Sequence, residues 1–418
     1  MNNKNEIISI LIKIIEDYKE KNNPSEIING LENNSKLKDL IYKQNELKKY
    51  IDKKQLLKFI FLRIVVRINS IGKGEIDNNQ LANSILEELN NIPYEYNFFF
   101  ELPLEIPEEI QDFIKISKKI SLGKIKYFNN SILKDNSKNY LIRRLLNPNE
   151  NIEPVNEKGI YLNINTQGFM YIEDINSSIF QEVYSKLKVF IYLAKIDGIL
   201  EDRKWNSKKL NLNLIYQDSK SESSYLNFPE GLAQLLSGLE ISKDIFSEKP
   251  KLLSLSESYD KEVNQSIKKI KLFEDRIKII STYLDYDENN SDIKRINTAI
   301  EWAFDSLINA NETFSFIKTC IGIEAIMSFD LNDNSNNNKK SDHTTNDIKQ
   351  RVSFMLGKNN KQRIDLAKKI HKIFQKRNIL VHGKELKLEN EDSDLLLEAQ
   401  NLLETIIQHE VNIFLKSK

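Results

Sequence analysis

The 418 residues of this chain, 40% of them hydrophobic, are enough for about two or three domains with their own cores. Its 61 basic residues are balanced by 61 acidic residues, which excludes a global attraction to nucleic acid, so any RNA-binding surface has to be a local patch. The single cysteine, Cys320, excludes an internal disulfide framework and fits a reducing cytoplasm, where we expect the protein to act.

Residues 1–91 form the first predicted region, which is helical. Its opening apolar run, residues 7–15, contains Lys13 and leads directly into Glu16 and Asp17. This pattern predicts an amphipathic helix and argues against a signal peptide or a membrane span, so no membrane contact is expected.

Residues 92–235 form the second predicted region, a mixed α and β module. Aromatic and polar residues alternate from Tyr94 to Leu102 between Pro93 and Pro103, which predicts a strand. Residues 160–164 and 169–172 predict a hairpin with a turn at Gly168. A helix is predicted over Ser178–Ile196, and alternation over residues 210–216 predicts another strand. The module has no Gly-rich phosphate loop and no catalytic grouping of side chains.

Residues 236–288 are predicted to connect this module to the last region. Apolar residues at helical spacing predict a charged helix over residues 259–288 that docks the C-terminal region on the module before it. The overall fold class is therefore α+β, with a mixed N-terminal part that resembles a sensor and an all-helical C-terminal bundle.

Residues 289–418 are predicted to contain four or five helices. Asn311 followed by Glu312 predicts the start of the second of them. Residues 332–347 lack apolar side chains almost entirely and predict a mobile loop. Three apolar stripes are predicted to face the core: Ile293, Ile296, Ile300, Ala303 or Phe304, and Leu307; Phe314, Ile317, Ile321, Glu324 and Ser328; and Leu395, Ala399, Leu402, Ile406, Ile413 and Phe414.

The most informative helix begins near Lys361 and has Arg377 on its apolar stripe, together with Leu366, Ile370, Phe374 and Val381. A guanidinium keeps its proton, so at such a position it needs a carboxylate or phosphate partner. Glu324 is the carboxylate predicted to pair with it.

Arg377 and His382 lie about 140° apart around this helix, whereas Asn378 and His382 share a face. Asn378 can therefore hold the imidazole in one tautomer, while Gly383 ends the helix in the left-handed conformation. Arg377 is expected to reach the same pocket from the side. The other three histidines are expected outside the site: His371 on the surface, His343 in the loop and His409 on the exposed flank of the last helix.

These residues resemble the HEPN superfamily, whose ribonucleases carry an arginine, a polar residue, three further positions and a histidine at a helix end. Residues 321–326, 351–357 and 374–383 are similar in order and character to the Apea-like branch, which occurs in bacterial anti-phage defence. The resemblance covers roughly residues 289–418.

The resemblance implies a metal-independent endoribonuclease that acts as a regulated toxin in abortive infection, cutting tRNA or mRNA. Arg377 would hold the scissile phosphate, Asn378 would fill the polar position, Glu324 would support Arg377, and His382 would act as general acid or base, leaving 2′,3′-cyclic phosphate and 5′-hydroxyl ends. It also implies a homodimer and a phage-derived or nucleotide trigger at the N-terminal region. Lys384 stands where a related branch has a tyrosine modified by its antitoxin, which argues against that control.

Two other hypotheses remain open. The C-terminal domain could be a non-catalytic HEPN module that binds RNA or a nucleotide and holds a partner in a defence complex. Alternatively, Arg377 and Glu324 could form a purely structural ion pair, since an arginine and a histidine at this spacing also occur by chance in helical proteins. The histidines form no cluster with cysteine at ligand spacing, so neither a metal nor another cofactor is expected.

Overall fold

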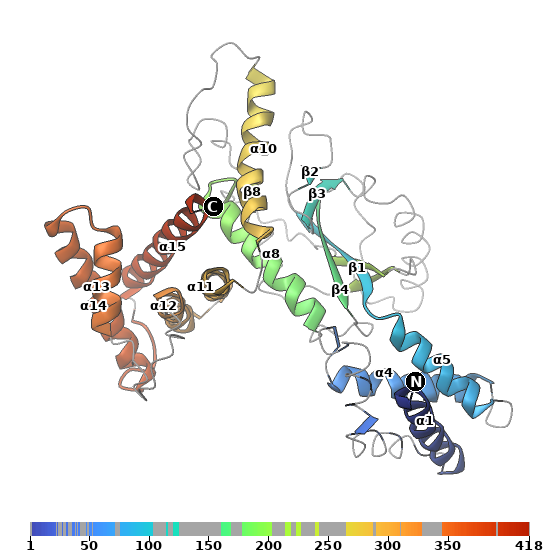
Figure 1. The fold of residues 1–418 in the computed structure, drawn as a ribbon. Helices are drawn as coiled ribbons and strands as arrows, with labels where there is room; N and C mark the ends of the chain where they lie inside the picture. Colours follow the sequence, from blue (N-terminus) through green and yellow to red (C-terminus); the bar gives the residue numbers. More distant parts are fainter. Residues whose placement is uncertain are drawn as a thin grey trace, which may run out of the picture. The chain divides into compact units, whose positions relative to one another are not determined.

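A computed structural model of the chain describes residues 2–21, 53–71, 76–102, 114–115, 120–124, 160–168, 178–202, 214–218, 223–226, 239–241, 265–286, 290–309, 311–327, 345–389 and 392–417, with single positions between 23 and 51. Helices predominate and strands accompany them, which confirms the α+β class (Figure 1). The helices are α1 (Asn2–Lys21), α4 (Lys53–Ile71), α5 (Asn78–Asn90), α8 (Ser178–Ile196), α10 (Gln265–Leu284), α11 (Ser291–Leu307), α12 (Glu312–Met327), α13 (Thr345–Leu356), α14 (Asn360–Val381) and α15 (Ser393–Lys416). The strands are β1 (Tyr94–Leu102), β2 (Ile114–Lys115), β3 (Ile120–Lys124), β4 (Ile160–Gly168), β5 (Leu200–Asp202), β6 (Leu214–Asp218), β7 (Ser223–Leu226) and β8 (Leu239–Ile241).

The chain divides into two compact units. The first consists of Met1–Phe98, Ile164–Tyr184 and Ile215–Leu226, and the second of Phe99–Asn163, Ser185–Leu214 and Asn227–Lys418. The four regions predicted from the sequence, with boundaries after residues 91, 235 and 288, stay a prediction.

Helices α1, α4 and α5 of the first unit share one apolar core (Figure 1). The predicted amphipathic helix at the start of the chain is confirmed, because α1 buries Ile7, Leu11 and Ile15 completely. Helix α5 begins at Asp77, whose carboxylate accepts a hydrogen bond from the backbone N–H of Asn79 at 2.8 Å and so satisfies one free donor of the first turn.

The larger sheet has six strands in the order β2-β3-β4-β1-β6-β7, and β5 pairs with β8 in a separate sheet. Strands β2 and β3 are antiparallel, with Ile114 opposite Leu122. The strand predicted between two prolines is confirmed as β1, which lies inside the sheet order, and Phe98 and Phe100 in it are fully buried.

The turn predicted to begin after residue 164 and to contain Gly168 is wrong, because β4 includes residues 165–167 and ends at Gly168. Two polar side chains in this stretch have partners on neighbouring elements: Thr166 donates to Glu182 of α8 at 3.2 Å, and Gln167 donates to Glu95 of β1 at 3.3 Å. Gly168 is needed for close packing, since a Cβ there would lie 2.7 Å from the Cδ1 atom of Ile179 on α8. The second half of the predicted hairpin, residues 169–172, lies outside the described residues.

Helices α8 and α10 contribute to the second unit. The predicted helix end before Asp197 and Gly198 is confirmed for α8. Within the second unit Lys188 of α8 is largely buried and forms an ion pair with Asp305 of α11 at 2.7 Å. The predicted connecting helix is observed as α10, which ends at Leu284, four residues before the predicted bound; residues 259–264 lie outside the described residues. A docking role for it stays a prediction.

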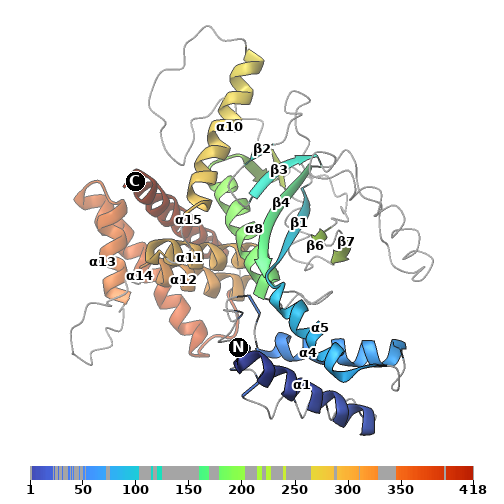
Figure 2. The same cartoon turned by 45° about the vertical axis from the view of Figure 1, so that its right-hand side comes forward.

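From residue 290 onward the described residues contain only helices, and α11 to α15 pack into a bundle (Figure 2). Short connections make α11 and α12, and likewise α13 and α14, neighbours along their length. Asn311 begins α12 as predicted, because its side chain accepts from the backbone N–H of Phe314 at 3.1 Å. Two arginines close the other end of α12: Arg295 donates to the carbonyl of Ile326 and Arg351 to that of Met327.

A buried hydroxyl cluster joins α11, α12 and α15. The hydroxyl oxygen of Ser306 lies 2.9 Å from that of Ser315 and 2.8 Å from that of Thr319, and the amide of Gln400 donates to Ser306 at 3.0 Å. Ser315 and Thr319 also donate to backbone carbonyls. Each hydroxyl therefore has partners inside the protein, as buried polar groups require.

The buried face of α12 differs from the predicted one. Phe314 is 59% exposed and Glu324 is half-buried, whereas the opposite positions are buried: Ser315, Phe316, Thr319, Cys320, Gly322, Ile323, Ile326 and Met327. The reason is that α12 contacts α11, α14 and α15, so helix contacts on several sides, together with the hydroxyl cluster, decide which positions are covered. Cys320 is buried in the core, as predicted, while Ser328 lies outside the described residues.

The other two predicted stripes are largely confirmed. All their members are buried except Leu307, which is 38% exposed at the end of α11, and Ile413, which is 51% exposed near the end of α15. The predicted loop lies outside the described residues up to 344, and its last residues, 345–347, instead begin α13.

Candidate active site

The end of α14 places His382 at the last position of the helix. His382 is the C-cap, and its backbone N–H bonds to the carbonyl of Asn378 at 3.0 Å. Gly383 has a φ of +69°, which confirms the left-handed conformation predicted for it. The N–H groups of Gly383 and Lys384 then bond to the carbonyls of Leu380 and Ile379, so the terminal carbonyls are satisfied and the exposed imidazole is fixed to a well-defined turn.

Arg377 lies on the apolar stripe of α14, whose buried members are Ile370, Ile373, Phe374 and Leu380. Val381 was predicted to belong to this stripe but is 48% exposed, because Leu380 on the opposite edge of the stripe is covered in its place. The Arg377 side chain keeps 24% of its surface exposed, so it is only partly buried.

The predicted partner of Arg377 is confirmed. Its Nη2 atom lies 3.1 Å from the Oε2 atom of Glu324 on α12, and its Nη1 atom donates to the Oδ1 atom of Asn378, also at 3.1 Å. The Nε atom is buried and has no hydrogen-bond partner among the described residues. The guanidinium is thus held by two partners, while its buried Nε donor has none among the described residues.

The carboxyl group of Glu324 is in an unfavourable place for a charge. Burial raises its pKa above the usual 4.5, and the neighbouring Arg377 guanidinium opposes this rise without cancelling it. The ion pair therefore does not fully offset the cost of partly burying the carboxylate.

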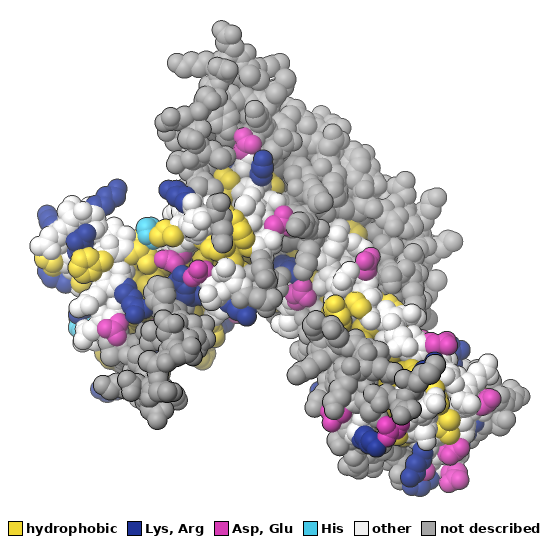
Figure 3. Space-filling view, in the orientation of Figure 1, with side chains coloured by type: hydrophobic (Ala, Val, Ile, Leu, Met, Phe, Trp, Pro, Cys, Tyr) yellow, Lys and Arg dark blue, Asp and Glu magenta, His cyan; other side chains and the backbone are white. Residues whose placement is uncertain are grey.

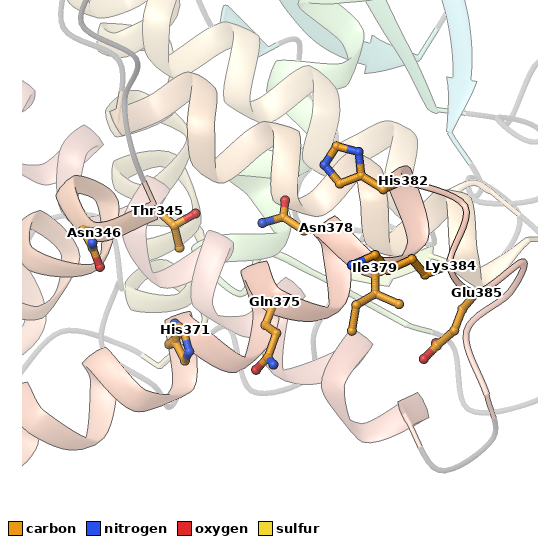
Figure 4. A pocket seen from close by; sticks show the side chains of 9 residues that line it. All are labelled: Thr345, Asn346, His371, Gln375, Asn378, Ile379, His382, Lys384 and Glu385. Carbon is orange, nitrogen blue, oxygen red and sulfur yellow. The ribbon is translucent and has the colours of Figure 1, made fainter.

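A pocket of about 820 Å³ opens along α14 (Figure 4). One face of that helix supplies His371, Gln375, Asn378, Ile379 and His382. The start of α13 supplies Thr345 and Asn346, and the segment after α14 supplies Lys384 and Glu385. In Figure 4, Thr345 and Asn346 lie at one end of the pocket and Lys384 and Glu385 at the other.

The structure joins three of the four predicted site residues in a chain of contacts. Asn378 accepts from Arg377 and also lines the pocket with His382, while Glu324 holds Arg377 from behind. Arg377 itself does not line the pocket in the single chain. The amide of Asn378 is therefore the link between the guanidinium and the pocket.

Sequence reasoning missed the other half of the pocket. His371 is exposed, as predicted, yet it shares the pocket with His382, and Gln375 lies between them. The spacing of His371, Gln375, Asn378 and His382 by four, three and four residues was a usable signal for one helix face. Nothing local indicated Thr345 or Asn346. His409 lies on α15 and is only partly exposed, and His343 lies outside the described residues.

An anchor holds the segment that follows His382. The ammonium group of Lys376 forms ion pairs with Glu385 and, at 2.7 Å, with Asp392. Burial lowers the pKa of Lys376, but the hydrogen bonds that its ammonium group donates to these two carboxylates, with their negative charges, outweigh this and raise the pKa overall. The backbone N–H of Leu388 also donates to the hydroxyl of Thr313 at 2.8 Å. Lys384 is therefore carried by a segment tied to both α14 and α12.

Among the described residues, no three His, Cys, Asp or Glu side chains are grouped as metal ligands would be. No helix in the described ranges has an apolar stretch long enough to cross a bilayer. No protein family, no curated protein and no solved structure matches the chain.

Proposed function

We propose that the chain is a metal-independent endoribonuclease of the HEPN type. The observation that carries the proposal is the contact series at the end of α14, in which Asn378 connects the Arg377 guanidinium to the pocket lined by His382. A fixed cation next to a pocket with an imidazole provides charge stabilisation and proton transfer, the two contributions that cleavage of a phosphodiester by its own ribose needs.

In the proposed reaction the ribose 2′-hydroxyl attacks the adjacent phosphorus, and the bond to the 5′-oxygen of the next nucleotide breaks. The 2′-hydroxyl loses its proton and the departing oxygen gains one, and His382 acts on one of these two transfers. The products carry a 2′,3′-cyclic phosphate and a 5′-hydroxyl. Arg377 stabilises the charge that builds up on the phosphorane, with Asn378 and Glu324 positioning it.

The proposal includes a homodimer, because Arg377 does not line the pocket of the single chain. In a twofold dimer each copy brings its own α14 to the shared cleft, so that the guanidinium and imidazole groups of both copies surround one phosphate. Cross-linking or sedimentation of the purified chain tests this part directly.

The charge of α14 supports an RNA substrate. This helix carries seven Lys or Arg residues against one acidic residue, Asp365, although the whole chain is neutral. Figure 3 shows Lys and Arg side chains over α13 and α14, two of the helices that contribute residues to the pocket. A local basic surface of this kind attracts the RNA backbone.

The wider role belongs to the same proposal. The resemblance noted above implies a restrained toxin in bacterial anti-phage defence, with residues 1–288 receiving a phage-derived or nucleotide trigger. Expression of the chain in bacteria tests this: growth arrest that is relieved by His382→Ala supports a toxin, and arrest that persists in this variant contradicts it.

The biochemical test uses purified full-length chain with labelled tRNA and mRNA in the presence of EDTA. We expect cleavage with cyclic-phosphate ends, identified by mass spectrometry, and a loss of at least about 100-fold in rate for His382→Ala. His409→Ala removes an imidazole outside the pocket and is the matched control, which should cut normally. Cleavage that is unaffected by His382→Ala contradicts the proposal.

A second candidate is a non-catalytic RNA-binding module that holds a partner. The observation that favours it is that α14 is basic although Arg377 does not line the pocket with His382, so RNA can be attracted to this helix without the two groups meeting at one phosphate. In that case RNA binds without cleavage under any trigger, and Arg377→Ala weakens binding sharply. The end-group experiment separates the two candidates.

A further inference from the structure

The pocket is much longer than the motif at its C-terminal end. His371 and His382 are eleven residues apart on one face of α14, which corresponds to about 16 Å along the helix axis. A single phosphate at His382 therefore occupies only one end. The remainder, lined by His371, Gln375 and Asn346, has no role in the reaction proposed above.

Each end of the pocket offers a place for an anion. At the near end, Lys384 accompanies His382, and the negative charge of Glu385 is countered by its ion pair with Lys376. At the far end, His371 faces Asn346, whose Oδ1 atom accepts a hydrogen bond from the ammonium group of Lys349 at 3.0 Å. Asp347 is the next residue in α13 but does not line the pocket.

Between the two ends lie side chains suited to a nucleobase. Gln375 is exposed and Asn378 half-buried, and the free face of a carboxamide offers both a donor and an acceptor to the edge of a base. Ile379 provides one apolar surface in the same lining. Proteins read bases in this way where RNA is single-stranded, because the bases of a duplex are stacked and their edges are less accessible.

We infer that this pocket binds single-stranded RNA over several nucleotides, with the scissile phosphate at His382 and Lys384 and a second phosphate, further along the strand, at His371 beside Asn346 and Lys349. The inference rests on the proposed function, which supplies RNA as the ligand. His371 is a binding residue in this arrangement and takes no part in the chemical step. Gln375 contacts the intervening base.

A solvent-exposed polar helix face is the simpler explanation of His371 and Gln375. It does not account for the walls at both ends, which come from the start of α13 and from the segment after α14. The second of these walls is fixed by the ion pairs of Lys376 with Glu385 and Asp392. A helix face that is simply exposed to water does not require that the segment after α14 be held in place beside it.

The test measures binding of fluorescent 2′-O-methyl RNA, which has no free 2′-hydroxyl and cannot be cut, to the full-length chain. A dinucleotide covers only the near end, and a longer single strand covers the whole pocket. His371→Ala should weaken binding of the longer strand about tenfold and leave the dinucleotide unaffected, as loss of one charge-assisted hydrogen bond predicts. His409→Ala, the imidazole control, should bind both as the wild type does.

Three outcomes overturn the inference: equal binding of the longer strand by the wild type and His371→Ala, no advantage of the longer strand over the dinucleotide, or no binding by the wild type. Its failure is distinguishable from failure of the nuclease proposal. If cleavage requires His382 but His371→Ala binds the longer strand normally, the second phosphate site is rejected and the nuclease proposal stands. If RNA binds as expected but is never cut, the nuclease proposal is rejected and the second phosphate site stands.

Discussion

The two ends of α12 carry polar groups of opposite character. Near its start, Ser315 and Thr319 belong to the hydroxyl cluster with Ser306 and Gln400, where the three hydroxyls are buried and bonded within the protein. Near its end, Glu324 holds Arg377 in a half-exposed pair that leaves the Arg377 Nε atom unused among the described residues. The polar groups at the start of α12 are thus satisfied within the protein, whereas the pair at its end leaves one buried donor without a partner among the described residues.

The strongest test of this contrast is Arg377→Ala. We expect RNA cleavage to fall by about 100- to 1000-fold, since a donor to the transition state is lost. Because the pair is partly exposed, the free energy of unfolding should fall by only about 1 kcal/mol. Chemical denaturation and cleavage assays on one preparation measure both effects.

The reverse result would place Arg377 in the same class as the hydroxyl cluster. A loss of about 3–5 kcal/mol with normal cleavage is what breaking a buried structural pair produces. Arg377→Lys serves as the companion variant, because it keeps the charge and loses the planar fork that contacts Glu324 and Asn378 together.

At the start of α12, where the hydroxyl cluster lies, we expect a loss of stability without a loss of cleavage. Ser306→Ala leaves Ser315, Thr319 and Gln400 short of a partner, so the free energy of unfolding should fall by about 1–3 kcal/mol while cleavage by the remaining folded protein is unchanged. Thr298→Ala, which removes an exposed hydroxyl from the same helix, should change stability by less than about 0.5 kcal/mol. A drop in the cleavage rate of folded Ser306→Ala would contradict the contrast.

A smaller effect is expected at the helix end that presents His382. Gly383→Ala forces a side chain into the left-handed conformation at φ +69° and should lower the free energy of unfolding by about 1 kcal/mol, with a modest loss of cleavage as the imidazole moves. Gly383→Asn should cost less, because asparagine tolerates this conformation better. Equal stability of the alanine and glycine proteins in thermal melts would show that the turn does not depend on glycine.

The smallest effect concerns pH. Since the pKa of Glu324 is raised in the folded chain, its contribution to stability is present below the usual value of 4.5 and is lost as the pH rises through the raised pKa. Glu324→Gln should therefore be at least as stable as the wild type near neutral pH and lose that advantage below 4.5. Denaturation midpoints of the two proteins across pH test this; an advantage that grows in acid would contradict the direction of the shift.

Local spacing predicted those parts of the site that depend on one helix or one partner. The helix end at His382 and Gly383 and the pairing of Arg377 with Glu324 followed from side-chain periodicity and from the need of a buried cation for a carboxylate. The strand β1 followed from alternation between two prolines. Each of these predictions used either the spacing of a few neighbouring residues or the need of one arginine for a carboxylate.

The parts that failed depend on which elements pack together. The covered face of α12 is chosen by α11, α14 and α15, so Phe314 is exposed although its spacing predicted burial. Gly168 was predicted to lie in a turn, but it belongs to β4 and lies close to the Ile179 side chain of α8. Thr345 and Asn346 reach the pocket only because α13 lies beside α14, which no spacing within either helix reveals.

The arginines at the end of α12 have an electrostatic consequence for Glu324. The peptide dipoles of a helix add up to about half a negative charge at its C-terminus, which repels a carboxylate in the last turn. Glu324 occupies that turn, and Arg295 and Arg351 donate to the final carbonyls of Ile326 and Met327. Two guanidinium groups thus offset the macrodipole one turn from the acid, so an anion can reside there and hold a third guanidinium in place.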